Sequence, residues 1–392
     1  MIRIAAKGDG VTEQGIHIPF GVPGDRVAQD GALTWGPHHV HPPCRHFPEC
    51  GGCQLQHADE AALARFVTER VLYAAEGQGI AVGELLPVHL SPPRSRRRAT
   101  LHGQRAGGAA VLGFRAAGSH RIVDMRECHV LRPELFALVA PLRALIARFG
   151  GRAPVDVALT LADQGADCVI KGLPLEGLEQ AEALLDFARE QGLARLALDH
   201  GYGPETSYEP HPVTIALAGT SVPLPPGAFL QATADGEARL AADARDFLSE
   251  MRVIADLFAG LGTFALALAG PAKVVAVEAD RAAHAACRAA ATATGKPVHT
   301  LHRDLFRNPL QPSELDRMDA VLLDPPRAGA REQMRAIATS TLARVAYVSC
   351  NPSSWARDCR MLIDAGFRLE ALRPVGQFLW STHVELTSLF VR

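Results

Sequence analysis

The chain has 392 residues, which is enough for two or three domains. Its mean hydropathy is close to zero, at +0.05, and no apolar run approaches the roughly 18 residues that span a membrane. Because no basic and apolar leader is present, we expect a cytoplasmic protein. We also expect it to have no membrane partner and to act as a monomer. The formal net charge of -2 neither requires nor excludes a nucleic acid partner.

The first 40 residues are rich in turns and predict a small β-structure. Short strands are expected over residues 2–4, 15–20 and 25–28, separated by glycine turns. This pattern favours a small β-barrel of the OB type, a fold that binds RNA in other proteins.

Three cysteines lie close together at Cys44, Cys50 and Cys53, with two glycines inside the tighter pair. Eight cysteines are too few for a disulfide scaffold in a chain of this length, and clustered ones indicate metal binding or catalysis. Cys128 is the best candidate for a fourth ligand. Four thiolates suit an iron–sulfur cluster or a structural zinc ion, for which His46 and His57 are alternative ligands.

The densest positive patch of the chain follows a proline pair and consists of Arg94, Arg96, Arg97 and Arg98. Such a patch suits contacts with RNA phosphates. The alternative is a solvated basic loop that has no partner.

Helix and strand patterns alternate through the rest of the chain. In the middle, helices are predicted over residues 57–76, 136–149 and 178–191, and strands over 155–161, 168–171 and 195–198. Towards the C-terminus, a helix over 235–250 precedes strands over 253–256, 274–278, 297–301, 319–323, 345–348 and 384–391. The last set predicts a doubly wound parallel sheet closed by a β-hairpin. We expect a barrel segment over 1–40, a central α/β domain with the cysteine site over 41–230, and a catalytic domain over 231–392.

The first strand of the C-terminal sheet runs into a glycine loop that contains Gly260 and Gly262. Glycine lets the backbone of such a loop turn tightly and approach a cofactor. Glu278 ends the next strand, where a carboxylate can accept both hydroxyls of a ribose, and Asp304 follows the third strand, within reach of an adenine. Each carboxylate alone is also typical of a helix N-cap. Because the third glycine of the dinucleotide fingerprint is missing, the loop favours S-adenosylmethionine over NAD.

Three more positions at strand ends suit covalent catalysis. Asp324 ends the fourth strand beside two prolines that stiffen its loop, Cys350 follows the fifth strand, and Glu385 lies in the last. A small buried cysteine and a solvent-facing glutamate are the alternatives. Addition of a thiolate to C6 of uracil makes C5 nucleophilic enough to attack a methyl sulfonium. Cys350 would be the nucleophile, Glu385 the base that removes the C5 proton, and Asp324 the group that orients a base flipped out of its stack.

Several motifs, in this order and spacing, resemble those of the RNA uracil-C5 methyltransferase family: DLFAGLGTFAL, VEAD, LLDPPRAG, YVSCNPSSWARDCRML and THVE. Upstream, CRHFPECGGCQLQH and RECHVL are similar to the family branch that carries a [4Fe-4S] cluster, whose best-known members modify 23S ribosomal RNA. The resemblance covers roughly residues 1–392. It implies a C-terminal Rossmann-like methyltransferase domain, a central α/β domain with the cluster, and a small N-terminal TRAM barrel.

The resemblance also implies roles for individual residues. Cys350 would be the nucleophile and Glu385 the base, and the cluster would be held by Cys44, Cys50, Cys53 and Cys128. The resemblance implies contacts with S-adenosylmethionine for Gln231, Phe258, Thr263, Glu278, Asp304 and Asp324. Gly260 and Gly262 would shape the loop that approaches the cofactor. We add Arg327 to the arginines expected to contact RNA.

The chain departs from the family pattern at a few places. The barrel is shortened between about Ala28 and Pro42, and Thr233 stands where Asn is usual. Near Glu385, Gly376 replaces a usual Asp and Leu379 a usual Pro. None of these changes removes a residue that the chemistry requires.

Three other functions fit the sequence less well. A cytosine-C5 RNA methyltransferase carries a second cysteine after the proline of the fourth-strand loop, where this chain has Arg327. A radical enzyme would need a C-x3-C-x2-C loop, and the spacing here is C-x5-C-x2-C. A non-catalytic RNA-binding protein would have no need of the strand-end residues. The sequence therefore predicts formation of 5-methyluridine in RNA, with 23S ribosomal RNA as the expected substrate and transfer RNA as the alternative.

Overall fold

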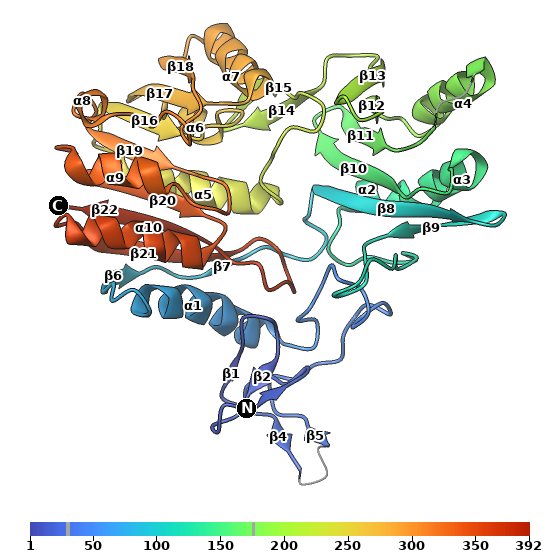
Figure 1. Ribbon diagram of the computed structural model, residues 1–392, viewed down its shortest axis with the longest axis horizontal. Coiled ribbons are helices and arrows are strands. Elements are labelled where there is room, and N and C mark those ends of the chain that lie inside the picture. The colour runs from blue at the N-terminus through green and yellow to red at the C-terminus, as the bar shows by residue number, and fades with distance from the viewer. Residues whose placement is uncertain (29–31, 175–176) are drawn as a thin grey trace.

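A nine-stranded sheet positions most of the expected catalytic residues (Figure 1). The computed structural model describes residues 1–28, 32–174 and 177–392. The strand order in the large sheet is β18-β17-β16-β19-β20-β22-β21-β6, and β7 also pairs with β21. The strands of the C-terminal part are β16 (Val253–Leu257), β17 (Lys273–Glu278), β18 (Val298–His302), β19 (Ala320–Leu323), β20 (Arg344–Ser349), β21 (Arg368–Gly376) and β22 (Glu385–Val391).

Five of these strands, from β18 to β20, run parallel, whereas β22 runs antiparallel to both of its neighbours. The expected parallel sheet with a closing antiparallel pair is confirmed. Strands covered on both faces form continuous apolar runs, and all four residues of β19 are buried. The carboxyl ends of parallel strands share one edge, which is where open α/β sheets bind ligands.

Helices cover both faces of this sheet (Figure 1). One face packs against α1 (Glu60–Glu76), α9 (Arg331–Thr339) and α10 (Pro352–Asp364), through apolar side chains such as Phe66 and Trp355. The other packs against α5 (Ala234–Phe247), α6 (Thr263–Leu268) and α7 (Arg281–Thr294). The short helix α8 (Pro312–Leu315) precedes β19.

Residues 60–90 belong structurally to the large sheet and not to the central domain over 41–230 expected from the sequence. The strands β6 (Val82–Leu85) and β7 (His89–Leu90) pair in parallel with β21, which lies almost three hundred residues further along the chain. Helix α1 packs against α10 and β21. The pairing with β21 satisfies the backbone groups of what would otherwise be an exposed sheet edge.

The central domain is built on a six-stranded sheet with the order β13-β12-β11-β10-β8-β9. Its strands are β8 (Arg98–Ala106), β9 (Ala109–Gly113), β10 (Val155–Ala162), β11 (Gly165–Lys171), β12 (Arg195–Asp199) and β13 (Pro204–Tyr208). Helix α4 (Gly177–Glu190) agrees with the prediction, but the helix expected over 136–149 is divided into α2 (Pro133–Ala137) and α3 (Val139–Phe149). The ring of Pro141 would clash with the carbonyl of Ala137 in one continuous helix.

The N-terminal segment forms two small sheets, and their ladders do not close into the expected barrel among the described residues. One sheet contains β1 (Arg3–Ile4), β2 (Gly10–Val11) and β3 (His17–Ile18), and the other contains β4 (Arg26–Val27) and β5 (Leu33–Thr34). Part of the shortened stretch, residues 29–31, lies outside the described residues. A further hairpin, β14 (Thr214–Leu217) and β15 (Thr220–Pro223), packs on α6 and α7. Across the described ranges, no helix has both the length and the apolar character needed to cross a membrane.

Candidate active site

The pairing of β20 with β22 places Cys350 next to Glu385. Ser349, the last residue of β20, lies opposite Leu386, so Cys350 follows β20 at the level where Glu385 begins β22. Both residues line the same cavity at the carboxyl edge of the sheet, together with Asp324. Glu385 is only 6% exposed, so it does not face bulk solvent as an ordinary strand glutamate would. The structure therefore brings the three expected catalytic residues together.

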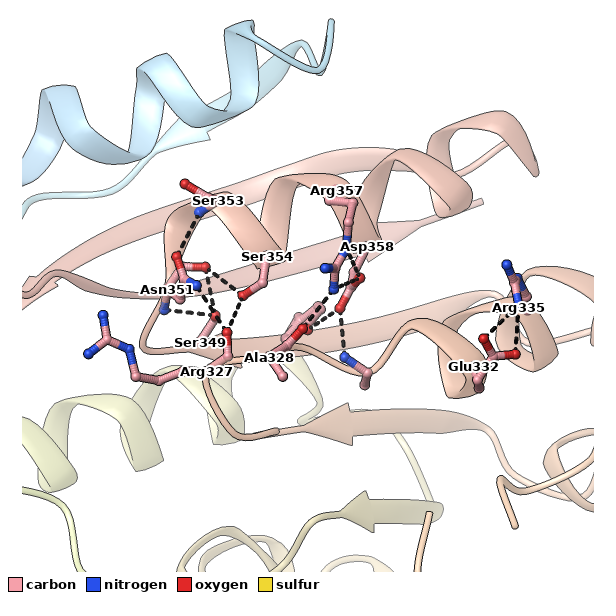
Figure 2. A network of polar contacts seen from close by, with 12 residues as sticks. Arg327, Ala328, Glu332, Arg335, Ser349, Asn351, Ser353, Ser354, Arg357 and Asp358 are labelled. Carbon is pink, nitrogen blue, oxygen red and sulfur yellow. Dashed lines mark hydrogen bonds and ion pairs between the residues drawn. The ribbon is translucent and has the colours of Figure 1, made fainter. Parts of the chain in front are cut away.

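The loop after β19 carries Asp324 and Arg327 and is fastened to the start of α10 (Figure 2). The backbone carbonyl of Arg327 accepts hydrogen bonds from Asn351 Nδ2 at 3.0 Å and from Ser354 Oγ at 2.9 Å. Further along the loop, Asp358 Oδ2 accepts from the backbone N–H of Ala330 at 2.7 Å. These bonds fix the backbone of the loop, while the side chain of Arg327 extends away from α10 (Figure 2) and lines the cavity.

Two glutamine side chains connect the carboxylates of the site. Gln231 Nε2 donates to Asp324 Oδ2 at 3.2 Å. Gln377 Nε2 donates to Gln231 Oε1 at 2.8 Å and also to Glu385 Oε2. Gln231 was expected from the sequence, but Gln377 was missed, because a glutamine next to a strand end has no pattern of its own.

Burial shifts the acid–base properties of all three catalytic groups. Removal from water raises the pKa of Asp324 to about 7, against the opposing hydrogen bond from Gln231. Burial, together with repulsion from Asp324, raises the pKa of Glu385 to about 8. Burial and the two carboxylates raise the pKa of the Cys350 thiol to about 11, while the cation of Arg327 opposes this rise. At neutral pH the site therefore holds Cys350 as a thiol and Glu385 mostly in its protonated form, so that only the ionised fraction of Glu385 can accept a proton.

The cavity continues towards β16 and β17 and has a volume of about 630 Å³. All but one of the residues expected to contact a cofactor line it. These are Gln231, Phe258, Gly260, Thr263, Glu278, Asp304 and Asp324. The exception is Gly262, which lies behind the loop, where a Cβ atom would come within 2.6 Å of Cys287 Sγ. Its φ of +90° and its close packing explain the glycine without a cofactor contact.

The glycine loop and its carboxylate are held together by hydrogen bonds. Glu278 Oε2 accepts from the N–H of Gly260 at 2.8 Å, and its Oε1 accepts from the N–H of Asp280 at 2.6 Å. Phe258 and the half-exposed Phe306 lie side by side in the cavity wall, with ring centroids 5.4 Å apart. Phe306 was missed by the sequence analysis, although an aromatic residue two positions after Asp304 was a visible signal.

Comparison with known proteins identifies the family. Residues 299–392 match the family model described as tRNA (Uracil-5-)-methyltransferase. The chain is 46% identical to an uncharacterized RNA methyltransferase of Zymomonas mobilis, over 100% of this chain and 99% of that protein. It is 34% identical to the 23S rRNA (uracil(1939)-C(5))-methyltransferase RlmD of Pectobacterium atrosepticum, over 92% of this chain and 82% of that protein.

The chain belongs to the RNA uracil-C5 methyltransferase family. The crystal structure of the Pyrococcus abyssi tRNA (uracil-54, C5)-methyltransferase in complex with S-adenosyl-L-homocysteine has the same fold. It superimposes with a TM-score of 0.74 and 20% sequence identity, covering 99% of this chain and 98% of that one. The resemblance seen in the motifs and the expected Rossmann-like domain are both confirmed.

In this methyltransferase, the four expected cysteines line one largely apolar cavity. Cys44, Cys50, Cys53 and Cys128 share its wall with side chains such as Phe114 and Met125. Burial raises the pKa of each thiol, that of Cys53 to about 12. Charge on the neighbouring thiols raises the pKa of Cys44, Cys50 and Cys53 further. In the parts of the chain that the structure describes, no group of three or more His, Cys, Asp or Glu residues is arranged to hold a metal ion.

The two histidines considered as zinc ligands lie in different surroundings. His46 lines the cysteine cavity, and its Nε2 accepts the N–H of Arg126 at 2.9 Å. His57 does not line that cavity; it is buried against the rings of Phe20 and Phe47. Burial lowers the pKa of His57 to about 4, so its imidazole is neutral at physiological pH.

The arginine stretch does not form the exposed patch expected from the sequence. Arg97 is buried, and its Nη2 pairs with Glu237 Oε2 at 2.5 Å, while its Nε donates to the carbonyl of Gln231 at 3.2 Å. Arg98 donates to the carbonyl of Leu230 at 2.9 Å, which leaves its cation in the wall of a cavity. Of the four arginines, only Arg94 is exposed. A buried guanidinium in an ion pair cannot contact phosphate, so we withdraw Arg97 from the RNA contacts.

Arg96 lies between the cysteine site and the loop that leads to Glu385. Its guanidinium lies 5.5 Å from the ring centroid of Phe114 and 5.4 Å from that of Phe378. A second contact comes from Gln54, directly after Cys53: its N–H donates to the carbonyl of Trp380 at 2.7 Å, and its Oε1 accepts from the N–H of Thr382 at 3.3 Å. The cysteine-rich loop thus packs directly on the loop between β21 and β22.

A second cavity, of about 840 Å³, adjoins the first and shares its central residues, Gln231, Arg327, Cys350 and Glu385. Its outer wall carries cations and aromatic rings: Lys7, Arg96, Arg98, Arg115, Phe114, Phe229 and Phe378. Cys350 and Glu385 therefore lie where two cavities meet, one at the glycine loop and one at a basic, aromatic surface.

Proposed function

We propose that this protein methylates C5 of a uridine in 23S ribosomal RNA, using S-adenosylmethionine and a covalent bond between Cys350 and the base. The single observation that carries the proposal is the meeting of two cavities at Cys350 and Glu385. One cavity is lined by a nucleoside-type loop and the other by cations and aromatic rings. A flipped base bound to Cys350 from one cavity could receive a methyl group at C5 from a donor in the other.

The chemistry follows from the positions of the three catalytic groups. The thiolate of Cys350 adds to C6 of uracil, and the electrons of the C5=C6 bond move towards O4 to give an enolate. S-adenosylmethionine supplies the methyl group, and C5 forms the new carbon–carbon bond as the S–CH3 bond breaks. Glu385 then removes the proton from C5, the C5=C6 bond forms again, and Cys350 leaves as a thiolate. Protonated Asp324, with its pKa near 7, could donate a hydrogen bond to the ring.

The methyl donor fits the cavity next to Gly260. Glu278 presents a carboxylate at the end of β17, where it can accept ribose hydroxyls, and Asp304 follows β18. Phe258 and Phe306 provide aromatic surface on the same wall. The lining suits a nucleoside with a sulfonium, because it includes the carboxylates Glu278, Asp304 and Asp324.

Ribosomal RNA is favoured over transfer RNA by similarity to RlmD, which extends over 92% of this chain. In the second cavity, Arg96, Arg98 and Arg327 would contact RNA phosphates or bases, together with the rings beside them. Arg94 stays a proposed contact at the exposed end of the stretch. Transfer RNA is the second candidate, because residues 299–392 match a family model whose description names tRNA.

The cysteine site fits a [4Fe-4S] cluster held by Cys44, Cys50, Cys53 and Cys128. Four thiols in one apolar cavity match the donor set of such a cluster. A Cβ atom on Gly51 would come within 2.7 Å of the carbonyl of Arg115, so this close backbone approach requires glycine. A structural zinc ion is the alternative metal for four thiolates. Four closed ligands would give the cluster a structural role.

The proposal is tested with the methyl donor labelled with tritium and with separate pools of ribosomal and transfer RNA. We expect label at C5 of a uridine in 23S ribosomal RNA, and none with Cys350→Ala. Label in transfer RNA alone would select the second candidate. Label at another atom, or none in either pool, would refute uridine methylation.

A further inference from the structure

The side chain of Gln377 connects Gln231, which lines the cofactor cavity, with Glu385, the proposed general base. It directly follows β21 and is buried, with 2% of its surface exposed. Its side chain reaches Gln231, Glu385 and the backbone of Thr233, which caps helix α5. A buried amide with three partners in two different segments, residues 231–233 and the start of β22, is held in one orientation.

The contacts fix which end of the amide faces Glu385. The backbone N–H of Thr233 can only donate, and it lies 3.3 Å from Gln377 Oε1. The oxygen of the amide must therefore face Thr233, and the NH2 group must face Gln231 Oε1 and Glu385 Oε2. The side chain of Gln377 also packs closely on the first turn of α5, where a Cβ atom at Gly236 would come within 2.9 Å of Gln377 Cβ.

We propose that Gln377 is a positioning residue that orients Glu385 as the base for the C5 proton. The inference rests on the proposed function and adds a residue to its machinery. Holding Glu385 Oε2 leaves Oε1 to accept the proton, and no donor among the described residues bonds to Oε1. Because the same NH2 group bonds to Gln231, which in turn bonds to Asp324, the base is linked to the cofactor side of the cavity.

The hydrogen bond from Gln377 also affects the pH at which Glu385 ionises. A donor to a carboxylate favours its charged form, and the contact with Gln377 opposes the rise in the pKa of Glu385 caused by burial and Asp324. The other groups that face Glu385 are the Cys350 thiol, after β20, and the Arg327 cation, across the shared cavity. None of them replaces the amide, because Gln377 is the only donor to the Glu385 carboxylate within the described ranges.

The test is the variant Gln377→Met, which keeps the length of the side chain and removes both polar atoms. It is assayed with RNA tritiated at uridine C5, by following tritium release and the amount of denaturant-stable protein–RNA adduct across pH. We expect the pH at which release is half-maximal to rise by about one unit, since the lost bond is one to a charged group. At neutral pH, release should slow about tenfold and the adduct should accumulate, because removal of the proton becomes limiting.

The matched control is Gln333→Met, which removes an equally buried glutamine amide that lines neither cavity. Gln333 is 1% exposed and bonds through both polar atoms to the backbone of Leu310. The control should lose similar stability and keep the wild-type pH profile. A profile for Gln377→Met that coincides with wild type, with no accumulated adduct, would overturn the inference. Absence of tritium release by the wild-type protein would instead refute the proposed function.

Discussion

Replacing Glu385 by Gln removes the proposed base and keeps its shape. Burial and Asp324 raise the pKa of Glu385 to about 8, so roughly one-tenth of it is ionised at pH 7 and one-half at pH 8. A step that needs the carboxylate should therefore quicken about fivefold over that interval in the wild-type protein. In Glu385→Gln this step should slow by about 10²–10⁴-fold, which is the usual contribution of a general base.

The assay isolates this step by following decay of the adduct between Cys350 and RNA in a single turnover. Once the sulfur is bonded to the ring, ionisation of the thiol, with its pKa of about 11, no longer affects the rate. The decay then depends on pH through Glu385. Adduct is resolved on a denaturing gel, and released tritium is counted in the same samples.

We expect Glu385→Gln to accumulate adduct that carries the transferred methyl group, and Cys350→Ser to form none. The reasoning is refuted if Glu385→Gln turns over as fast as wild type. It is also refuted if wild-type adduct decays at one rate from pH 6 to pH 9, because a carboxyl group with a pKa of about 8 must then have no part in the step.

Three further predictions concern the surrounding structure. Arg97→Met should lower the free energy of unfolding by about 3 kcal/mol, because it leaves Glu237 buried without its partner. Urea unfolding measures this loss. The double variant Arg97→Met with Glu237→Leu should recover part of it. Gln54→Ala should increase hydrogen exchange over residues 377–384 by removing the bond to Thr382, and unchanged exchange would contradict the contact between the two loops. Glu278→Gln should weaken binding of S-adenosylhomocysteine by about 10–100-fold in calorimetry, as expected for a lost hydrogen bond to a charged group. The control variant Glu332→Gln, changed at an exposed glutamate, should bind the ligand as tightly as the wild-type protein does.

The arginine stretch shows where reasoning from local sequence failed. Four cations after a proline pair predict an exposed patch, but Arg97 reaches Glu237 at a distance of 140 residues along the chain. The cost of burying a guanidinium is offset only by a partner that the fold supplies. The same limitation applies to Gln377, because its partners Gln231 and Thr233 lie more than 140 residues before it in the chain, and Glu385 lies on the next strand.

Local sequence by itself determined β22 and the five parallel strands of the C-terminal sheet, the glycine loop, the strand-end carboxylates and the grouping of cysteines, but it did not predict β21. These features depend on periodicity and on spacings of a few residues, which are readable without the fold. The tertiary structure decided that β6 and β7 complete the sheet and that β22 pairs with β20 in the register that places Glu385 beside Cys350. The reason is physical: strand register and buried polar partners are set by contacts between distant segments, and only the folded chain brings those segments together.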